Sequence, residues 1–392
     1  MAHRKSPARI AKDARVAHFR SLAAPQAAAL QAAAAPGPAL AWDAIASLDA
    51  RLVGRIVLPS SPDYNEARQE SNPAFQAYPE IIVYCACEND VLECLAVARA
   101  YKVWVAVRCG GHSTAGYSVN SGMVVDLSDM KGVVLDPALE RVHVLPGTDF
   151  DHFNGAMNHT GWHVPTGACG SVCVGGFVQG GGYGYTSRAF GIQSDLVESF
   201  RVALANGTIV TASAQDHSDL FWALRGGTGG NFGVVLQVTY RMHRLDQVWA
   251  WAISWDQAHA AQVLTLMQKS FMKTGAPDAL GYMMNLGYQQ GVPVYMVQGM
   301  FCGTREVGLQ AIAPLLAIPS AQLLVDKTGT YPEMNIWLED HPYTLPDAFR
   351  LAPPPEPEPL WKQAWEAKHP QIAIVGLMPL IVGSGFSPGA AT

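Results

Sequence analysis

Two glycine-rich stretches constrain this chain more than any other feature of its sequence. Residues 107–113 read Val-Arg-Cys-Gly-Gly-His-Ser, and residues 165–184 read Pro-Thr-Gly-Ala-Cys-Gly-Ser-Val-Cys-Val-Gly-Gly-Phe-Val-Gln-Gly-Gly-Gly-Tyr-Gly. Glycine has no Cβ atom, so it adopts left-handed conformations at low cost and lets the backbone approach a ligand closely. Each stretch also carries one nucleophilic side chain, His112 or Cys169. Together they predict loops that close on a large phosphorylated cofactor. The alternative is a pair of glycine-rich turns with a buried histidine and cysteine nearby.

The composition predicts a large, well-packed globular protein. Of 392 residues, 49% are hydrophobic and 15% are charged, against roughly 25% charged in an average soluble protein. A chain of this length can hold two domains and a sizeable core. The 26 Lys and Arg against 32 Asp and Glu give a net charge of −6 without a basic stripe, which argues against a nucleic-acid partner. No apolar run reaches the ~20 residues of a membrane helix.

Neither the cysteines nor the N-terminus predicts an exported protein. The seven cysteines are an odd number, which is not a disulfide framework. Cys85-x-Cys87 and Cys169-x3-Cys173 lack a second ligand pair at zinc spacing, so we expect no metal site. Residues 1–40 combine early basic residues with the Ala-rich stretch Ala27–Ala35, and they contain no apolar signal core. We expect a disordered or frayed leader and a cytoplasmic protein.

The pattern over residues 77–144 predicts a β-α-β-type unit. We expect a helix that is capped by Asn89-Asp90, flanked by the strands Ile81–Tyr84, Val103–Val107, Met123–Leu127 and Arg141–Leu145. A second unit is expected to contain the strand Glu198–Ala205, the turn Asn206-Gly207, the helix Asp219–Leu224 and, after a glycine loop at 225–233, the strand Val234–Tyr240. No G-x-G-x-x-G fingerprint stands between a strand and a helix, so a Rossmann fold is not predicted.

Residues 246–350 predict an α+β block with antiparallel strands, which we interpret as a substrate domain. Trp249, Trp251 and Trp255 alternate with smaller residues, as expected of a strand with one aromatic face. Helices are expected at Gln257–Lys273 and Glu306–Leu316, and strands at Tyr282–Leu286 and Pro293–Met300. The Pro-rich segment 353–359 is expected to be extended, followed by an atypical apolar tail to residue 392.

A resemblance to a known family rests on motifs between about Gly54 and Thr330. They are Asp90-Val91, Arg108-x-Gly110-Gly111-His112-Ser113, Val125-Asp126-Leu127, Gly147, Gly167-x-Cys169, Gly175-Gly176, Gly180-Gly181-Gly182-Tyr183-Gly184, Gly191, Asn206-Gly207, the run Asp219–Gly227 and Gly230-Asn231-Phe232-Gly233. In this the chain resembles the vanillyl-alcohol-oxidase and p-cresol-methylhydroxylase (PCMH)-type flavoproteins, in particular the berberine-bridge-enzyme-like branch. The resemblance implies an α+β fold, with a two-part FAD-binding domain (41–245, core about 75–245) packed on a substrate domain (246–350) that has an antiparallel sheet and helices.

The resemblance also implies how the cofactor is held. In that branch the matching histidine is bonded to the flavin 8α-methyl group and the matching cysteine to flavin C6, so FAD is expected to be bicovalently attached through His112 and Cys169. The other implied cofactor-binding residues are Arg108, Gly110, Gly111, Ser113, Gly116, Gly167, Val172, Gly175, Gly176, Gly181, Gly182, Tyr183, Gly184, Asn231 and Gly233. A small residue such as Val172 is associated in relatives with oxygen access, although a core valine explains it equally well.

The implied reaction is oxidation of a small molecule. A C–H bond next to a hydroxyl or amine would give hydride to flavin N5 while a base removes a proton, and dioxygen would reoxidise the flavin to give hydrogen peroxide. Three alternatives stay open at this stage. They are a flavin dehydrogenase with another acceptor, a flavin-binding protein with little or no turnover, and a glycine-rich binding module without flavin.

No catalytic base can be assigned from the sequence. Relatives continue past the substrate domain with a helix and a Tyr-x-Asn segment that returns to the flavin, and no such segment follows Tyr343. We therefore expect a chain that is truncated at its C-terminus. The remaining candidates for the base are Tyr282, Tyr288, Tyr295, Tyr331 and His163, for each of which a structural role is favoured.

Overall fold

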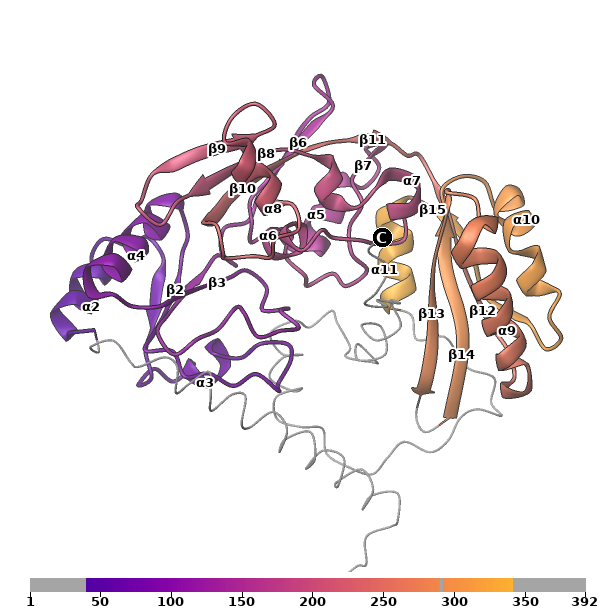
Figure 1. Cartoon of the computed structure of the whole chain (residues 1–392), viewed down its shortest axis with the longest axis horizontal. Coiled ribbons are helices and arrows are strands. Elements are labelled where there is room, and N and C mark those ends of the chain that lie inside the picture. Colours follow the sequence, from indigo (N-terminus) through magenta and orange to yellow (C-terminus); the bar gives the residue numbers. More distant parts are fainter. Residues whose placement is uncertain (1–39, 290–291, 341–392) are drawn as a thin grey trace, which may run out of the picture. The chain divides into compact units, whose positions relative to one another are not determined.

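The computed structural model describes residues 40–289 and 292–340, and these fold as two compact α+β units (Figure 1). The first unit contains the described residues up to Met130 together with Ala203–Ile209 and Phe232–Val234, and the second contains the rest. The α+β class is therefore confirmed. The domain boundary at 245/246 stays a prediction. The predicted leader up to residue 39 and the predicted Pro-rich tail lie outside the described residues.

The first unit is built on a four-stranded sheet in the order β1-β2-β4-β3. β2 (Ile81–Tyr84), β4 (Met123–Asp126) and β3 (Val105–Arg108) are parallel, and β1 (Arg55–Val57) is antiparallel to β2. Every residue of β2 and β4 is buried, which is why both read as continuous apolar runs. β3 ends at Arg108, within the first glycine-rich stretch.

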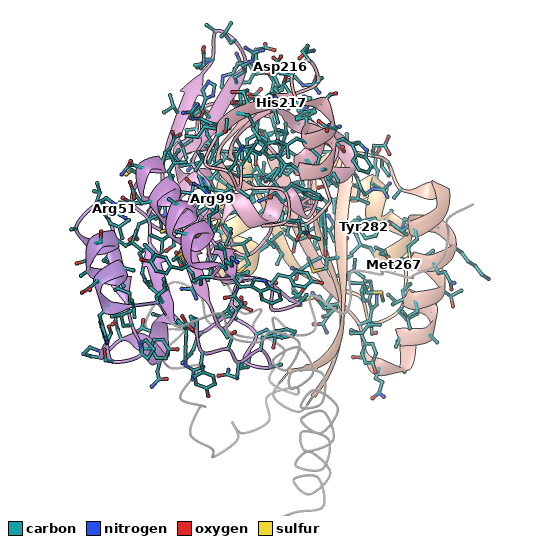
Figure 2. All side chains as sticks on the ribbon, turned by 60° about the vertical axis from the view of Figure 1, so that its left-hand side comes forward. Arg51, Arg99, Asp216, His217, Met267 and Tyr282 are labelled. Carbon is teal, nitrogen blue, oxygen red and sulfur yellow. The ribbon has the colours of Figure 1, made fainter. Side chains whose placement is uncertain are left out.

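Two helices of this unit, α2 (Trp42–Asp49) and α4 (Glu88–Tyr101), lie side by side (Figure 1). Arg51, which follows α2 and is labelled in Figure 2, forms an ion pair of 2.7 Å with Glu93 of α4. A short helix, α3 (Tyr64–Ala67), precedes β2 and is held by the Tyr64 hydroxyl, which donates to the Pro79 carbonyl at 2.8 Å.

The predicted cap of α4 was wrong by two residues. The helix begins at Glu88 with Cys87 at the N-cap position, so Asn89 and Asp90 lie inside its first turn. The Asp90 carboxylate is fully buried and accepts hydrogen bonds of 2.8–2.9 Å from the backbone N–H groups of Val53, Gly54 and Ala86. It therefore satisfies three donors outside the helix, which a sequence-local capping rule does not reveal.

The second unit begins with a five-stranded sheet in the order β5-β6-β10-β8-β9. Its strands are β5 (Val133–Asp136), β6 (Arg141–Val144), β8 (Val197–Ala203), β9 (Ile209–Ser213) and β10 (Val234–Arg241). The helices of this part are α5 (Phe150–Met157), α6 (Val174–Gln179), α7 (Ser187–Phe190) and α8 (Ser218–Leu224), with a 3₁₀ turn at Gln193–Leu196. A small pair is formed by β7 (Trp162–His163) and β11 (His243–Arg244).

The same unit continues into a four-stranded antiparallel sheet in the order β13-β14-β12-β15. Its strands are β12 (Val248–Ser254), β13 (Leu280–Gln289), β14 (Val292–Phe301) and β15 (Gln322–Gly329). Helices α9 (Ala260–Leu266) and α10 (Arg305–Leu316) cover one face, and α11 (Tyr331–Asp340) follows β15 and packs on the other (Figure 1). The antiparallel sheet with helices is the block that the sequence predicts.

The alternation along β12 decides which face is which. Trp249, Trp251 and Ile253 pack with residues of α9 and α10, while Val248, Ala250 and Ala252 pack with Tyr185 and α11. Figure 2 shows Met267 and Tyr282 together on the helix-covered face. Both faces of the strand are buried, so the aromatic face predicted for this strand is confirmed as one side of a sheet core.

The predicted single helix over Gln257–Lys273 is divided. A 3₁₀ turn at Gln257–His259 leads into α9, and a π-helical segment runs over Met267–Gly275. Val263, Met267 and Phe271 are its buried residues, so the apolar positions were identified and only the hydrogen-bond register differs. Within the two described ranges no helix is both long and apolar enough to cross a membrane.

Candidate active site

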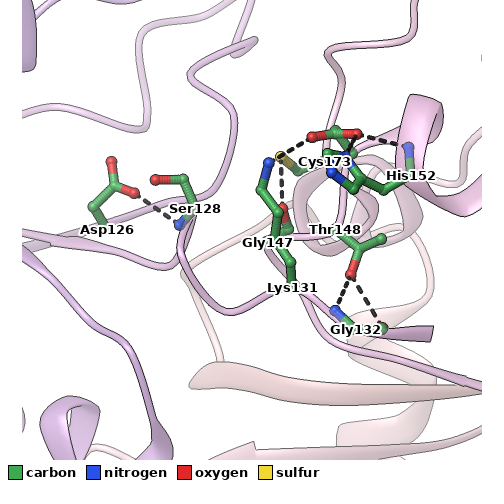
Figure 3. A network of polar contacts seen from close by, with 9 residues as sticks. Asp126, Ser128, Lys131, Gly132, Gly147, Thr148, His152 and Cys173 are labelled. Atoms are coloured by element: carbon green, nitrogen blue, oxygen red, sulfur yellow. Dashed lines mark hydrogen bonds and ion pairs between the residues drawn. The ribbon is translucent and has the colours of Figure 1, made fainter. Parts of the chain in front are cut away.

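Arg108 is the last residue of β3 and the first residue of the first candidate loop. Its side chain forms a buried ion pair with Asp126. Its Nε donates to Asp126 Oδ2 at 2.5 Å, and Asp126 Oδ1 accepts from the Ser128 N–H at 2.8 Å, as Figure 3 shows for the latter pair. Burial alone lowers the pKa of Arg108, but Asp126 and Tyr84 outweigh it and the pKa ends above its ordinary value. Nη1 and Nη2 are buried and have no hydrogen-bond partner among the described residues. The guanidinium thus stays cationic with two nitrogens available to a water or ligand.

The loop that follows holds His112 between two glycines with left-handed backbone. Gly111 has φ +70° and Gly116 has φ +73°, and a Cβ on Gly116 would lie 2.5 Å from the Phe75 ring. The Gly111 carbonyl accepts from the backbone N–H and the hydroxyl of Ser71 at 2.9 and 3.0 Å. His112 is half-buried, as are its neighbours Gly110 and Ser113. The backbone around His112 is therefore fixed from both sides.

A buried carboxyl group next to this loop, Glu70, has no counterpart in the sequence predictions. It is 6% exposed, and Gly111 would place a Cβ 3.8 Å from its Cα. Neither carboxylate oxygen has a hydrogen-bond partner of regular geometry within the described residues. Burial raises the pKa of Glu70 to about 7, a rise that Ser118 and Arg108 limit. Its neighbours in sequence are polar, so no pattern marks it as buried.

Cys169 lies in a tight loop bonded to the start of α5. The Asp151 N–H donates to the Gly170 carbonyl at 3.0 Å, and the Phe150 N–H to the Val172 carbonyl at 3.1 Å. A Cβ on Gly170 would meet Asp151 Oδ1 at 1.9 Å, so glycine is required there. The Cys169 thiol is half-buried and lies 3.5 Å from the Ser171 hydroxyl. Val172 is half-buried in the same loop.

The second cysteine of this stretch has a different environment. Cys173 is buried and its thiol donates to the Gly147 carbonyl at 3.4 Å (Figure 3). Beside it, Asp149 caps α5 by accepting from the His152 N–H at 2.9 Å, and it pairs with Lys131 at 2.7 Å. Burial opposes ionisation of Asp149, but Lys131 and His152 hold its pKa below the ordinary value. Cys173 is therefore part of a structural network, in contrast to Cys169.

Three more glycines of the second stretch are required by close packing. A Cβ on Gly182 or Gly167 would lie 2.5 or 2.9 Å from the Phe177 ring, and one on Gly184 would lie 1.9 Å from the Thr166 carbonyl oxygen. Gly181 has φ +102°. Gly175 is buried in α6. These contacts explain Gly167, Gly182 and Gly184 without any ligand.

Gly176 is not among the glycines that close packing requires. It lies in α6, is exposed, and a Cβ there would meet nothing within 4 Å. Neither backbone conformation nor packing among the described residues requires glycine at this position. A helical glycine costs about 1 kcal/mol relative to alanine, and no contact among the described residues offsets that cost.

The last three candidates lie on exposed or loop positions. Tyr183 is 52% exposed. Asn231 is exposed and its Nδ2 donates to Thr228 Oγ1 at 2.6 Å and to the Gly227 carbonyl at 3.1 Å, which braces the third glycine loop. Gly233 has φ +138°, a conformation that favours glycine. Arg108 to Gly116 and Gly233 belong to the first unit, and the other candidates belong to the second.

The candidates for a catalytic base occupy structural positions. His163 is buried, its Nε2 lies 2.8 Å from Thr186 Oγ1, and burial together with His243 lowers its pKa to about 3. Tyr282 packs on the helix-covered face of the sheet, and Tyr295 shares that strand side with Val297. Tyr331 is buried and bonded to Thr166. The side chain of Tyr288 lies outside the described residues.

Comparison with known proteins identifies one domain of this chain. Residues 79–213 match the model of an FAD binding domain, and this range includes both His112 and Cys169. The structure of BBE-like 1 from Physcomitrella patens superposes with a TM-score of 0.69 at 25% identity, covering 77% of this chain and 66% of that one. Residues 79–213 therefore form an FAD-binding domain.

Other relatives of this FAD-binding domain are oxidoreductases. An uncharacterised FAD-linked oxidoreductase from Bacillus subtilis, YgaK, is 35% identical over 210 residues, 52% of this chain and 47% of that protein. The xylooligosaccharide oxidase of Myceliophthora thermophila has a TM-score of 0.67 at 26% identity, covering 78% of this chain and 64% of that one. The chain thus spans about half of the first relative and less than two thirds of the second. Within the described ranges no group of three or more His, Cys, Asp and Glu side chains could hold a metal ion.

Proposed function

We propose that this protein holds FAD through two covalent bonds, from His112 and from Cys169, and oxidises a small molecule with dioxygen as electron acceptor. One observation carries the proposal. Both nucleophiles lie within the residues that match an FAD-binding domain, each half-buried in a loop whose backbone is fixed by hydrogen bonds. Cys173, four residues after Cys169, is instead buried in a structural network.

Two features of the described residues fit such a cofactor. Gly176 leaves open space beside α6 where a side chain would stand. The Nη1 and Nη2 atoms of Arg108 are buried donors without a partner in the part of the chain that the structure describes, and they suit the acceptor oxygens of a nucleotide or of a water that it orders. The glycines at 111 and 116 leave the backbone of the His112 loop uncovered by Cβ atoms.

When bound, FAD would take two electrons and a proton from the substrate as hydride at N5 and pass the electrons to dioxygen, which leaves as hydrogen peroxide. The residues of this chain would position the flavin and the substrate. Substitution of the flavin ring at two atoms makes it a stronger oxidant, and the loops of His112 and Cys169 hold it in place. The substrate C–H bond next to a hydroxyl or amine must be held close and oriented.

The proposed substrates are small polar molecules, with sugars and oligosaccharides first. This part rests on the likeness to a xylooligosaccharide oxidase. Alcohols and secondary metabolites are the other members of the proposed class. A flavin dehydrogenase would share the same attachment and differ in its electron acceptor, and a protein with little turnover would bind flavin but not be reduced.

The test is the visible spectrum of the purified protein before and after acid precipitation. We expect yellow colour in the pellet for wild type, for His112→Ala, for Cys169→Ala and for the matched control Cys173→Ala. The double variant His112→Ala/Cys169→Ala is expected to release its colour into the supernatant. Colour released by wild type would refute the covalent attachment, and a colourless protein after addition of FAD would refute flavin binding.

The reaction is tested on the same preparations with a panel of mono- and oligosaccharides under air. Bleaching of the flavin absorbance with peroxide formation supports an oxidase. Bleaching that is reversed by an artificial acceptor but not by air would establish a dehydrogenase. Absence of bleaching with every sugar and alcohol of the panel would contradict the proposed substrate class.

A further inference from the structure

Helix α11 brings two buried polar side chains onto the segment that precedes Cys169. Tyr331 and Asn335 are four residues apart, so they lie on one face of the helix. Both are buried, at 2% and 1% exposure. Their hydrogen-bond partners are the carbonyls of Thr166, Gly167 and Ala168. A helix distant in sequence therefore holds three successive carbonyls immediately before the reactive cysteine.

Tyr331 fixes the first of these residues. Its hydroxyl donates to the Thr166 carbonyl at 2.8 Å, and Thr166 Oγ1 donates to the same phenol oxygen at 3.1 Å. The ring stands edge-on to His163, with centroids 4.4 Å apart. Burial raises the pKa of Tyr331, so the phenol keeps its proton and the donor is permanent. A Cβ on Gly184 would lie 1.9 Å from the same carbonyl oxygen, so the chain at Gly184 passes close to Thr166.

Asn335 fixes the next two residues. Its Nδ2 donates to the Gly167 carbonyl at 3.1 Å and to the Ala168 carbonyl at 3.4 Å. Only the NH₂ end of the amide can serve two carbonyls, so these contacts set the orientation of the side chain. Buried hydrogen bonds of this kind are costly to remove, because the carbonyls left behind have no water.

The other side of Cys169 is held by α5. Gly170 and Val172 accept from the backbone N–H groups of Asp151 and Phe150 at 3.0 and 3.1 Å. Cys169 is consequently the residue between two anchors, α11 before it and α5 after it. Its own side chain remains half-buried.

We propose that Tyr331 and Asn335 are positioning residues that set the place of the Cys169 thiol for bond formation with the flavin. The proposal rests on the bicovalent attachment proposed above. Attachment replaces the S–H bond of Cys169 and the C–H bond at flavin C6 by one C–S bond. The two electrons pass to the flavin and then to dioxygen, which takes up the two protons and leaves as peroxide. A displacement of about 1 Å can slow such a step ~100-fold, whereas the His112 bond, made from another loop, is unaffected.

Three substitutions separate positioning from general loss of structure. Asn335→Leu keeps the volume and removes both hydrogen bonds, and Asn335→Asp places a carboxylate against two carbonyl oxygens. Tyr331→Phe keeps the ring against His163 and removes the contacts with Thr166, so it remains informative if a change at Asn335 prevents folding. The matched control is Glu333→Gln, on the same helix, where a half-buried carboxylate lies 3.1 Å from His159 and accepts from the Thr330 N–H, a role that the glutamine oxygen can keep.

The first readout is the share of each flavin bond, by mass spectrometry of proteolytic peptides. We expect Cys169-linked flavin to fall at least tenfold in Asn335→Leu and severalfold in Tyr331→Phe, with His112-linked flavin and the Glu333→Gln control at the wild-type level. Wild-type amounts of Cys169-linked flavin in both Asn335→Leu and Tyr331→Phe would overturn the proposal.

The second readout does not need the flavin. In protein expressed without it, the loosened loop is expected to expose Cys169, so that its alkylation by iodoacetamide is severalfold faster in Asn335→Leu than in wild type or Glu333→Gln. Equal alkylation rates would overturn the positioning role. If wild type carried no flavin on either residue, the proposed function would fail while this rate would still decide whether α11 positions the thiol.

Discussion

At the scale of single residues, Glu70 gives the first unit a definite dependence on pH. Burial raises its pKa from an ordinary 4.5 to about 7, so the folded state binds this proton more tightly than the unfolded chain. The stabilisation is complete below pH ~4.5 and is lost as the pH rises through about 7. The neighbouring groups that act on it are Ser118 and Arg108.

Glu70→Gln is therefore expected to stabilise the protein at pH 8, by at most about 3 kcal/mol, and to have little effect at pH 4. Glutamine keeps the shape of the protonated acid but cannot ionise. Urea unfolding at the two pH values measures this difference. Glu66→Gln, in an exposed position of α3, is the control. Equal changes in stability at both pH values would contradict a buried titrating carboxyl at position 70.

The sequence alone indicates that these loops need glycine, but it does not show whether packing or ligand binding requires it. Gly116 is required by the ring of Phe75, and Gly182 by the ring of Phe177, contacts that form only after folding. Glu70 was missed because a polar residue in a polar segment has no pattern that indicates burial. The sequence singles out His112 and Cys169 by residue type and by the family resemblance, and their role as flavin ligands stays a prediction.

At the scale of elements, α6 contains the position where packing and ligand binding can be separated. Gly176→Ala is expected to stabilise the cofactor-free protein by up to about 1 kcal/mol and to weaken FAD binding, because the added methyl group occupies space that the cofactor needs. Affinity is best measured in the His112→Ala/Cys169→Ala background, where binding is reversible, by quenching of flavin fluorescence. Thermal unfolding of the cofactor-free protein reports the stability.

Gly155→Ala is the matched control for this measurement. Gly155 is an exposed glycine of α5, and a Cβ there also meets nothing within 4 Å. We expect the same gain in stability and no change in FAD affinity. If both variants leave the affinity unchanged, Gly176 does not face the cofactor.

Elements with a strong apolar pattern were predicted and those with polar buried faces were not. β2 and β4 are continuous apolar runs, and their predicted bounds agree with the structure to within a residue. Helix α11 was missed because its buried face includes Tyr331 and Asn335, which interrupt an apolar stripe. The π-helical segment was missed because apolar spacing indicates which residues are buried, not which carbonyl each N–H reaches.

At the scale of the whole molecule, the proposed flavin would act as a covalent cross-link between residues 112 and 169. It closes a loop of about 57 residues, for which the chain-entropy model gives about 4 kcal/mol of stabilisation. Either single variant, His112→Ala or Cys169→Ala, opens the loop. We therefore expect each to lose about the same free energy of unfolding and the double variant to lose little more.

Denaturant unfolding of wild type, both single variants, the double variant and Cys173→Ala measures this effect. The control should lose less than the single variants, since it leaves the loop closed. Losses that add up in the double variant would mean that each side chain stabilises the fold separately and that no cross-link exists.

The division into these two compact units could not be predicted from the sequence, for a physical reason. Local patterns report neighbours along the chain, whereas the first unit includes Ala203–Ile209 and Phe232–Val234, which return to it from far downstream. The predicted boundary at 245/246 rests on a change in the residue pattern along the chain. Such a change does not indicate which later segments pack back onto an earlier unit.

This return has a consequence for synthesis. A ribosome releases the chain from the N-terminus onward, so the first unit remains incomplete until residue 234 has emerged. By then residues 131–231 of the second unit, apart from the returning segment, are already outside the exit tunnel. The first unit can therefore be completed only after residues 131–231 have emerged, and a nascent chain halted near residue 130 would lack both returning segments.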